Sequence, residues 1–438
     1  MRKIDSVAVL GTGTMGLGIA ALAANKGKKV LFLDLASDGG DRNAVAAAAL
    51  ERMKTIRPPA LDDPENVKFI EIGNFEDDLA KIKDYDWICE AIVEDVKIKR
   101  NFFNTVEPLR RDGSIIATNT SGIPLRDIAE GMPERFRKDL AVTHFFNPVN
   151  IMKLMELVPC DDTEPEVIDA LAEFCSTVLG KGVVHAKDTV NFIGNRIGCF
   201  FMLSGLHKAA KSGLSMETVD ALMSKPVGLP GTGLYGLIDL IGLDIMDFVG
   251  KNLEINLPAG DVGRETNKFP APEQAMLERG QLGRKTGGGF YKMTKNDDGS
   301  RSKETFDLST QAWRPADEVS LVDELQQLET LIFADSAEGR FAWDLMGGTL
   351  CYAADLVPEI ADDIVNIDNA MKWGFGWRKG PFEMLDALGP DRVIARLKAE
   401  GQPVPAMLKV LESAGAASFY RDEGREFLTL DGNYIATP

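Results

Sequence analysis

One glycine-rich segment near the N-terminus constrains the fold more than any other part of the chain. Residues 7–10 are apolar and lead directly into three closely spaced glycines, which an alanine-rich stretch follows. In a strand–turn–helix unit the first glycine permits the tight turn, the second lets a phosphate approach the backbone, and the third lets the helix pack closely. The segment therefore predicts a βαβ unit that binds a dinucleotide. The candidate contacts are Gly11, Gly13, Thr14, Met15 and Gly16.

The acid that follows the second apolar stretch indicates which dinucleotide is bound. Asp34 directly follows residues 29–33 and lies eighteen positions after Gly16. A carboxylate at this place binds the ribose 2′-hydroxyl and repels a 2′-phosphate. The sequence therefore predicts NAD rather than NADP. A glycine-rich loop without a ligand is the alternative, and the combination of strand, helix and trailing acid disfavours it.

The first part of the chain alternates apolar strands with helical stretches, which predicts a Rossmann-type, doubly wound parallel sheet. Near Asn147 and Pro148 the chain turns, and the next apolar stretch is expected to return beside the strand before it. The expected strands cover residues 7–10, 30–33, 69–72, 87–91, 114–118, 141–145, 153–158 and 183–186.

The rest of the chain is helical in pattern and contains an internal repeat. Residues 233–244 and 380–391 share Gly, Asp, Gly and Asp at matching offsets, and the Phe-Tyr pair after Gly289 recurs after Ser418. A repeated segment indicates a duplicated structural unit. We therefore expect two related all-α domains after the sheet domain. The predicted limits are 1–187 for the NAD-binding domain, 188–297 for the first helical domain, 298–320 for a linker and 321–438 for the second helical domain.

Composition excludes several classes of protein. The net charge of -18 disfavours binding to nucleic acid or to anionic membranes, and the chain has no apolar run long enough to span a membrane. The chain enters its first strand within a few residues, which leaves no room for a signal peptide. Five scattered cysteines without a CxxC pair are typical of a reducing, cytoplasmic setting. We expect no metal site.

His144 is the best candidate for a catalytic base. A dehydrogenase that oxidises an alcohol must remove the hydroxyl proton, and histidine is the usual base near neutral pH. The chain has three histidines, and only His144 ends an apolar strand. The carboxyl ends of such strands face the ligand crevice. A buried structural histidine is the alternative.

Glu156 strengthens this interpretation. It lies among apolar residues on the strand expected to return beside His144. A carboxylate in such surroundings is costly unless it is paired, and a pair with His144 would orient the imidazole and stabilise the imidazolium. The alternative is a glutamate at the sheet edge that faces water.

Three further residues are candidates with structural alternatives. Ser121 follows the strand at 114–118 and either caps a helix near Pro124 or donates to a substrate oxygen. Asn195 lies in an apolar helix and is either a satisfied core amide or a donor to the substrate carbonyl. Lys285, in a glycine-dense segment, either lies on a surface turn or contacts the cofactor phosphates.

These motifs, in this order, resemble the L-3-hydroxyacyl-CoA dehydrogenases of fatty-acid β-oxidation. The resemblance rests on the glycine-rich turn, Glu90-Ala-Ile-Val-Glu94 with Lys99, NTSGIP, HFFNP, KLMELVP, Asn195-Arg196 and GRKTGGGFY, and it spans residues 1 to about 292. The duplicated helical part is similar to the tandem C-terminal domains of multifunctional β-oxidation proteins. The resemblance implies NAD-dependent oxidation of (S)-3-hydroxyacyl-CoA to 3-ketoacyl-CoA.

The resemblance also implies roles for individual residues. His144 matches the catalytic base and Glu156 its carboxylate partner, while Ser121 and Asn195 match the residues that polarise the substrate. The implied cofactor contacts, besides the glycine-rich turn, are Asp34, Glu94, Lys99, Asn147 and Lys285. The chain departs from the family in having Val190-Asn191 where the family has Pro-Gly.

Two rival functions stay open at this stage. Residues 36–65 hold few cations and no convincing CoA-phosphate site, which favours a dehydrogenase of a small hydroxy acid, such as gulonate. A non-catalytic, crystallin-like protein would keep the NAD fold without turnover. The last residues, 428–438, are typical of the start of a connection, so we expect a fused or partner enoyl-CoA hydratase. The second helical copy predicts a monomer that is internally a pseudo-dimer.

Overall fold

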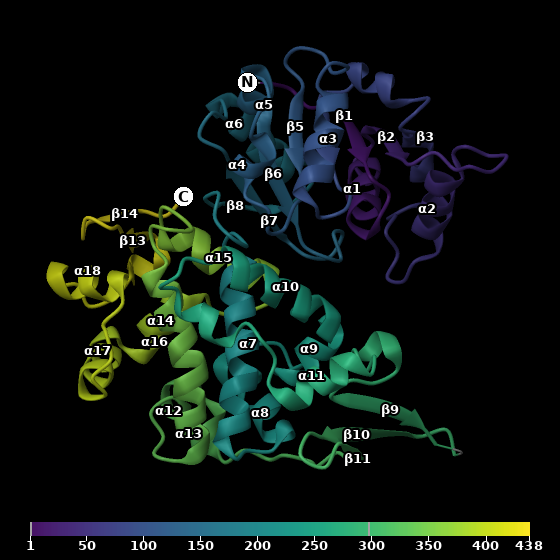
Figure 1. Ribbon diagram of the computed structural model, residues 1–438. Coiled ribbons are helices and arrows are strands. Elements are labelled where there is room, and N and C mark those ends of the chain that lie inside the picture. The colour runs from purple at the N-terminus through teal and green to yellow at the C-terminus, as the bar shows by residue number, and fades with distance from the viewer. Residues whose placement is uncertain (1, 297) are drawn as a thin grey trace. The chain divides into compact units, whose positions relative to one another are not determined.

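The structure is a computed structural model in which the chain divides into two compact units (Figure 1). It describes residues 2–296 and 298–438, so residues 1 and 297, where two predicted domain limits fall, lie outside the described residues. Unit 1 comprises Met1–Ile193 and Glu359–Asp362, and unit 2 comprises Gly194–Pro358 and Asp363–Pro438.

Unit 1 is built on one eight-stranded sheet in the order β3-β2-β1-β4-β5-β6-β7-β8. The first six strands in this order are parallel, and β7 returns antiparallel to β6 as the turn near Asn147 predicts. The predicted Rossmann-type sheet is confirmed. The strands are β1 (Ser6–Leu10), β2 (Lys29–Asp34), β3 (Ile70–Asn74), β4 (Trp87–Glu90), β5 (Ile115–Thr118), β6 (Leu140–Phe145), β7 (Leu154–Pro159) and β8 (Gly182–His185).

The core of unit 1 forms because its strands are continuous apolar runs that are buried on both faces of the sheet. Val7 and Val9 on β1 pack in one buried cluster with Ile19 of the first helix, and Phe103 and Phe136 bring two other helices into ring contact. The six helices connect successive strands. They are α1 (Thr14–Asn25), α2 (Ala44–Thr55), α3 (Val96–Val106), α4 (Leu125–Ala129), α5 (Glu134–Asp139) and α6 (Pro165–Glu173).

The strand order reverses between β1 and β4, which lie side by side in the sheet. In open α/β sheets, ligands bind outside the carboxyl ends of the strands at such a switch point. The glycine-rich turn follows β1, the segment from Ala91 to Glu94 follows β4, and His144 lies near the end of β6. The fold therefore brings the predicted residues of unit 1 to one edge of the sheet.

A short segment from far along the chain completes unit 1. Glu359–Asp362 belongs to this unit although its neighbours in sequence belong to unit 2. The amide of Lys187 donates to the carbonyl of Ile360 at 2.9 Å, and Lys187 Nζ pairs with Asp362 at 2.6 Å. Lys187 therefore joins this segment of the second repeat to the sheet domain.

Unit 2 contains both helical repeats around α7 (Gly194–Ser212), which packs against helices of each repeat. The structure thus groups the two predicted helical domains in one compact body. The other helices are α8 (Met216–Leu222), α9 (Tyr235–Ile241), α10 (Leu243–Asn256), α11 (Ala271–Glu278), α12 (Leu328–Leu331), α13 (Ala337–Ala342), α14 (Gly348–Asp355), α15 (Ile364–Gly374), α16 (Pro381–Leu388), α17 (Pro390–Ala399) and α18 (Ala406–Ala414).

The sequence repeat corresponds to a repeated hydrogen-bond arrangement. In the first copy, the Asp239 carboxylate accepts from the amides of Phe290 and Tyr291, each at 2.8 Å. In the second copy, Asp386 accepts from the next Phe-Tyr pair, residues 419–420, at 2.6 and 2.9 Å. A carboxylate that accepts two amides fixes the chain entering each Phe-Tyr segment. The duplication is therefore structural as well as sequential.

Two segments differ from the predictions. The expected linker at 298–320 contains two strands of a small sheet, which the ring contact of Phe306 with Trp313 (centroids 5.2 Å apart) stabilises. The expected connection at 428–438 contains a paired strand. The strands of these small sheets are β9 (Tyr291–Lys295), β10 (Arg301–Asp307), β11 (Ala312–Pro315), β12 (Tyr420–Arg421), β13 (Glu426–Leu428) and β14 (Tyr434–Ala436). Strands β10 and β14 bury few side chains, so neither has the apolar run that predicts a strand.

Candidate active site

Two of the three glycines in the turn after β1 are required by contacts within the protein, and the third is not. Gly11 has a φ of +108°, and a Cβ there would lie 2.5 Å from the carbonyl oxygen of Ala91. A Cβ at Gly16 would lie 1.9 Å from the carbonyl oxygen of Gly11. A Cβ at Gly13 would meet no described atom within 4 Å. The protein itself requires Gly11 and Gly16, whereas Gly13 leaves open the space that a pyrophosphate needs. The turn therefore fits a dinucleotide.

Asp34 lies at the end of β2 directly beside this turn. Its Oδ2 accepts from the amide and from the hydroxyl of Thr12, each at 2.6 Å, and its Oδ1 accepts from Leu35. Arg52 of α2 donates to the Thr12 carbonyl at 3.0 Å, a contact that the sequence did not indicate. Thr14 and Met15 form the first turn of α1. The carboxylate is thus held where a ribose of the dinucleotide is expected.

Lys99 lies between two carboxylates and is 1% exposed. Its Nζ is 2.6 Å from Oε1 of Glu90 and 3.4 Å from Oε2 of Glu94. Glu90 is fully buried and also accepts from the Thr118 hydroxyl at 2.6 Å. Burial raises the pKa of Glu90, and Lys99 opposes that effect. The sequence alone does not indicate the role of Glu90, because its partner lies nine residues away on α3.

Glu94 fixes the segment that carries Ser121. Its Oε1 accepts from the Thr120 hydroxyl at 2.6 Å and from the amides of Ser121 and Gly122 at 2.9 and 3.2 Å. Burial alone would raise the pKa of Glu94, but Lys99 and these donors outweigh it and the pKa is lowered. The carboxylate is therefore held ionised between Lys99 and the Ser121 segment.

The alternative interpretation of Ser121 as a helix cap is wrong. Helix α4 begins after Pro124, the N-cap residue, whose side chain accepts no hydrogen bond from the first backbone amides of the helix. Instead, the carboxylate of Asp188 accepts from the amides of Leu125 and Arg126 at 2.5 and 2.9 Å. Because Asp188 supplies the cap from a distant part of the chain, Ser121 is not needed for that purpose.

His144 and Glu156 form the predicted pair. The two residues are opposite each other on β6 and β7, with His144 Nδ1 2.6 Å from Glu156 Oε2. Glu156 is fully buried, which excludes the interpretation that it faces water. Its Oε1 accepts from the amide of Ile193 at 3.0 Å. The carboxylate therefore fixes the imidazole through Nδ1, and Nε2 is the nitrogen available for proton transfer.

Two aromatic rings and one amide side chain define the surroundings of His144. The rings of Phe146 and Phe192 lie 4.6 and 5.7 Å from the imidazole, measured between centroids. Asn119 Oδ1 accepts from the amide of Phe145 at 3.0 Å. This bond joins the end of β6 to the segment after β5 that carries Ser121. The imidazole thus lies in largely apolar surroundings at the sheet edge, with Asn147 exposed in the turn that follows.

The segment between β8 and α7 has a left-handed backbone. Asn191 has a φ of 60° and Phe192 a φ of 51°. Asparagine tolerates this region better than other non-glycine residues. The departure from Pro-Gly at positions 190–191 therefore keeps the backbone conformation that glycine would allow.

Two predicted site residues belong to unit 2. Asn195 is the second residue of α7, and Lys285 Nζ pairs with Asp244 Oδ1 at 2.5 Å. His144, by contrast, belongs to unit 1. The roles assigned to Asn195 and Lys285 therefore stay predictions.

The described residues show neither a metal site nor a helix that could span a membrane. Within residues 2–296 and 298–438, no group of three or more His, Cys, Asp or Glu side chains is arranged to hold a metal ion. In the same ranges, every helix is too short or too polar to cross a membrane.

The fold and the site define a dinucleotide-binding protein with a buried acid–base pair. The sequence model described as "3-hydroxyacyl-CoA dehydrogenase, NAD binding domain" matches residues 6–189. The model described as "3-hydroxyacyl-CoA dehydrogenase, C-terminal domain" matches residues 192–293 and again 345–429. The chain belongs to the 3-hydroxyacyl-CoA dehydrogenase family, whose N-terminal domain binds NAD.

Curated relatives agree with this assignment. A "Probable 3-hydroxyacyl-CoA dehydrogenase" of Bacillus subtilis is 37% identical over 99% of this chain and 57% of its own length. One of the same name from Deinococcus radiodurans is 40% identical over 67% of this chain and 84% of its own length. The chain spans about half the length of the long relatives, which include a Rickettsia felis protein named as a trifunctional enzyme of a fatty acid oxidation complex.

Solved structures also match. The 3-hydroxybutyryl-CoA dehydrogenase of Escherichia coli covers 94% of this chain with a TM-score of 0.70, and its 22% identity supports the fold alone. The (S)-3-hydroxybutyryl-CoA dehydrogenase of Ralstonia eutropha covers 66% of this chain, and 98% of that structure is covered, with a TM-score of 0.55 and 29% identity.

Proposed function

We propose that this protein oxidises (S)-3-hydroxyacyl-CoA to 3-ketoacyl-CoA with NAD⁺, as part of fatty-acid β-oxidation. The observation that carries the proposal is the buried pair of His144 and Glu156 at the carboxyl edge of a dinucleotide-binding sheet. An alcohol oxidation releases a hydride and a proton. At the carboxyl ends of the strands, the bound dinucleotide would accept the hydride and His144 would accept the proton.

The reaction needs a hydride acceptor, a base for the proton and hydrogen-bond donors to the substrate oxygens. NAD⁺, when bound, supplies a nicotinamide ring that accepts the hydride from C3 of the substrate. His144 Nε2 takes the hydroxyl proton, and Glu156 stabilises the resulting imidazolium through Nδ1. Ser121 and Asn195 are proposed to donate hydrogen bonds to the substrate oxygens, where charge develops.

The proposed cofactor contacts follow the geometry of the edge. Gly11, Gly13 and Gly16, with Thr14 and Met15, form the pyrophosphate turn, and Asp34 binds the adenosine ribose. Glu94 and Lys99 lie on the segment after the neighbouring strand and are proposed to contact the other half of the dinucleotide. Asn147 and Lys285 complete the proposed set.

The test is NADH oxidation with acetoacetyl-CoA, run beside free acetoacetate. We expect turnover of the thioester alone, and His144→Ala should lower kcat by about 10²- to 10⁴-fold. A His144→Ala protein as active as the wild type would contradict the assignment of the base. His207, a half-buried histidine in unit 2, gives the matched control as His207→Ala.

One observation favours a second candidate, oxidation of a small hydroxy acid. The cations in residues 36–65 are few, and Arg42, Arg52 and Lys54 already bind Glu76 and Asp77, the Thr12 carbonyl and Glu51. Turnover of free acetoacetate would support this candidate. NADH binding without turnover of either compound would instead favour a non-catalytic, crystallin-like role.

The partners are also proposals. We infer that an enoyl-CoA hydratase acts together with this chain, fused or as a separate partner, because the long relatives extend well beyond the matched length. We further propose a monomer, since both repeats pack within one unit. A native mass near 47.7 kDa would refute the fusion, and sedimentation as a tight dimer would refute the monomer. The free state of all five cysteines supports a cytoplasmic location.

A further inference from the structure

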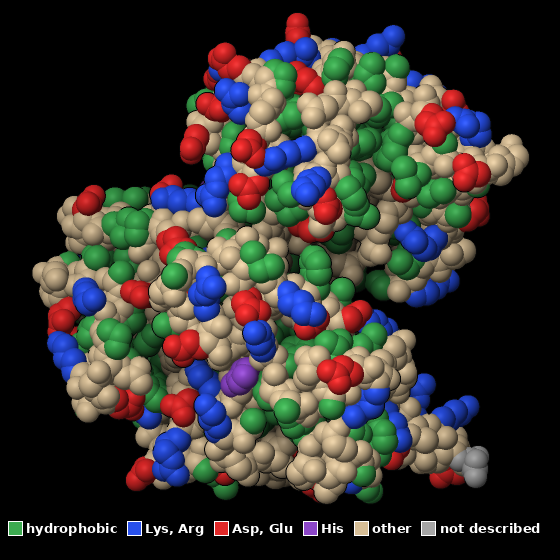
Figure 2. Space-filling model, viewed as in Figure 1, with side chains coloured by type: hydrophobic (Ala, Val, Ile, Leu, Met, Phe, Trp, Pro, Cys, Tyr) green, Lys and Arg blue, Asp and Glu red, His purple; other side chains and the backbone are tan. Residues whose placement is uncertain are grey.

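Unit 2 contains a cavity of about 580 Å³ that the reaction does not use. Its walls come from α9, from the glycine-dense turn at 284–287 and from strands β9 and β10. Three cations line it, Arg284, Lys292 and Lys303. Figure 2 shows several Lys and Arg side chains over the β9–β10 hairpin, at the lower right of that view. The volume is in the usual range of small-molecule sites.

Comparison of the two repeats explains why the first copy is open here. Asp220 accepts from the amides of Tyr235 and Gly236 at 2.7 and 3.1 Å. In the second copy, Asp368 accepts from the amides of Phe382 and Glu383 at 2.8 and 3.1 Å. Gly236 therefore occupies the backbone position of Glu383. The first copy lacks the carboxylate side chain that the second copy has at this place.

In the second copy this carboxylate is fully engaged. Glu383 Oε1 pairs with Lys372 at 2.6 Å, and Oε2 accepts from the amide of Gly380 at 2.8 Å. The second repeat thus carries its own anion at this position. In the first repeat, Gly236 has no side chain at this position and lines the cavity.

The backbone does not require a glycine at position 236. A Cβ there would have as its nearest neighbours Asp220 Oδ2 at 3.5 Å and Thr232 Cβ at 3.7 Å, both ordinary contacts. Glycine within a helix costs up to about 1 kcal/mol relative to alanine. The residue is therefore unfavourable for α9 and is explained by the space it leaves.

The charges around the cavity favour an anion. Arg284 and Lys303 form no ion pair with any residue in the described part of the chain, whereas Lys292 pairs with Glu304 at 3.1 Å. Lys303 Nζ lies 3.6 Å from the centre of the Tyr291 ring. The one carboxylate among the lining residues, Asp239, accepts from two backbone amides, and burial raises its pKa to about 6 although Arg284 and Lys303 oppose that effect. Two unpaired cations thus face one space in a chain of net charge -18.

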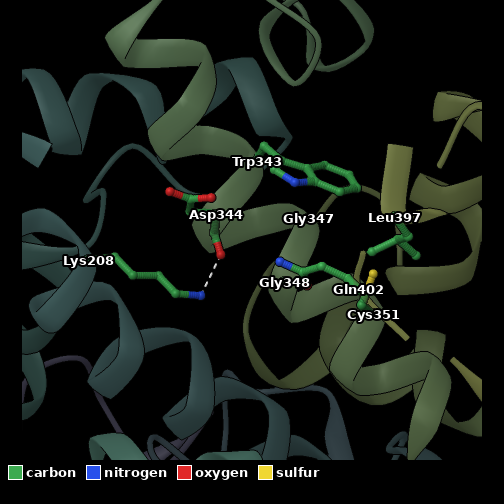
Figure 3. A pocket seen from close by; sticks show the side chains of 8 residues that line it. All are labelled: Lys208, Trp343, Asp344, Gly347, Gly348, Cys351, Leu397 and Gln402. Atoms are coloured by element: carbon green, nitrogen blue, oxygen red, sulfur yellow. Dashed lines mark hydrogen bonds between the residues drawn. The ribbon is translucent and has the colours of Figure 1, made fainter. Parts of the chain in front are cut away.

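A second pocket of unit 2 makes the contrast clear. It has a volume of about 230 Å³ and contains one cation, Lys208. The Lys208 ammonium donates to the carbonyl oxygen of Asp344, as the dashed line in Figure 3 marks. Its charge is therefore already engaged by the protein. Between these two pockets, the arrangement at Gly236 is the one suited to an anionic ligand.

We propose that the cavity beside Gly236 binds the pyrophosphate group of a small molecule, either inorganic pyrophosphate or a nucleoside diphosphate. Guanidinium and ammonium groups bind phosphate oxygens through short, charge-assisted hydrogen bonds. Arg284 and Lys303 would bind the phosphates, and Thr232 offers a hydroxyl donor at the cavity wall. Lys285, a proposed cofactor contact, belongs to the same turn but is not among the lining residues, and the proposal does not depend on the proposed reaction.

The experiment is a titration of the full chain with inorganic pyrophosphate and, separately, with ADP, by calorimetry at low ionic strength. Saturating NADH is present throughout so that the dinucleotide site is blocked. Gly236→Glu places in the first repeat the side chain that the second repeat has, and should abolish binding. Arg284→Ala and Lys303→Ala, both exposed, should each weaken binding by about tenfold.

Two controls make the result decisive. Gly236→Ala adds only a Cβ with room around it and should bind within about twofold of the wild type, since no charge changes. Lys409→Ala removes an exposed cation of α18, far along the chain from the lining residues, and should bind like the wild type. Absence of pyrophosphate and ADP binding by the wild type would overturn the proposal. Binding that Arg284→Ala and Lys303→Ala leave unchanged would overturn it as well, even if Gly236→Glu fails to fold.

Discussion

At the scale of the residue, we propose that Glu156 is a positioning residue that acts through His144. Its two oxygens are divided between His144 Nδ1 and the amide of Ile193. One carboxylate thus fixes both the imidazole and the backbone close to Phe192, whose ring packs beside the imidazole. The orientation of the base therefore depends on a residue that lies behind it.

Glu156→Gln tests this positioning role. The amide keeps the size of the side chain but cannot stabilise an imidazolium, so we expect kcat to fall by roughly 10²-fold or more with little change in the KM for NADH. Steady-state kinetics over a pH series measures both. Glu173, an exposed glutamate at the end of α6, is the matched control as Glu173→Gln. A kcat within twofold of the wild type would rule out the role.

The glycines of the turn allow a second prediction at this scale. Gly16→Ala places a Cβ 1.9 Å from a carbonyl oxygen and should destabilise the protein by about 2 kcal/mol or more. Gly13→Ala meets open space and should leave the melting temperature nearly unchanged while weakening NADH binding by about tenfold. Thermal unfolding and NADH fluorescence titration measure the two effects. Equal NADH affinity in Gly13→Ala and the wild type would refute the pyrophosphate assignment.

At the scale of the element, the small sheet of β9, β10 and β11 is attached to α8 through one carboxylate. Glu217 of α8 accepts from Arg314 with both oxygens, at 2.8 and 2.9 Å, and from the Thr305 hydroxyl at 2.7 Å. Burial would raise the pKa of Glu217, but Arg314 and Thr305 outweigh it and lower the pKa from 4.5 to about 2. This attachment therefore depends on an ionised glutamate.

The lowered pKa determines how the attachment depends on pH. The folded protein binds the Glu217 proton more weakly than the unfolded chain, so the carboxylate stabilises the fold above about pH 4.5. That stabilisation is lost as the pH falls from about 4.5 to 2. We expect Glu217→Gln to lower the free energy of unfolding at pH 7 and to match the wild type increasingly below pH 4. Urea unfolding at several pH values measures this, and a pH-independent difference would contradict it.

Elements are also where prediction from sequence succeeded and failed. The strands of unit 1 were predictable because they are buried on both faces and form continuous apolar runs. Residues 301–307 are mostly charged or polar and bury only Thr305 and Phe306, which are adjacent, so their pattern does not predict a strand. The pairing of His144 with Glu156 was predictable because one short turn joins their strands. Glu90 and Asp188 were not, because their partners depend on the tertiary fold.

At the scale of the whole molecule, most of the proposed contacts of the dinucleotide lie in unit 1, whereas the proposed pyrophosphate contacts lie in unit 2. NADH should slow amide hydrogen exchange in the turn at 11–16 and in the segment at 91–99, and leave β9 and β10 unchanged. Pyrophosphate, added with NADH already bound, should protect residues 291–295, whereas the turn at 284–287 carries both Arg284 and Lys285 and does not distinguish the two ligands. Exchange followed by mass spectrometry separates the two patterns. If pyrophosphate protects only the turn at 11–16, the two sites are not distinct.

The duplication in unit 2 shows how far a repeat can be interpreted from sequence. The matching Gly and Asp positions predicted two equivalent copies. The equivalent hydrogen bonds from backbone amides to Asp239 and to Asp386 agree with that. The differences between the copies carry the new information. Gly236 and Glu383 occupy equivalent positions, but only the three-dimensional arrangement shows that one opens a cavity and the other forms an ion pair.

The segment at 359–362 has a consequence for the order in which the protein takes shape during synthesis. The ribosome makes every strand of the sheet domain before the first helical repeat, yet the partners of Lys187 are encoded within the second. Unit 1 therefore lacks the segment at 359–362 until most of the polypeptide has been synthesised. The sheet domain can therefore be completed only after the segment at 359–362 of the second repeat has been synthesised.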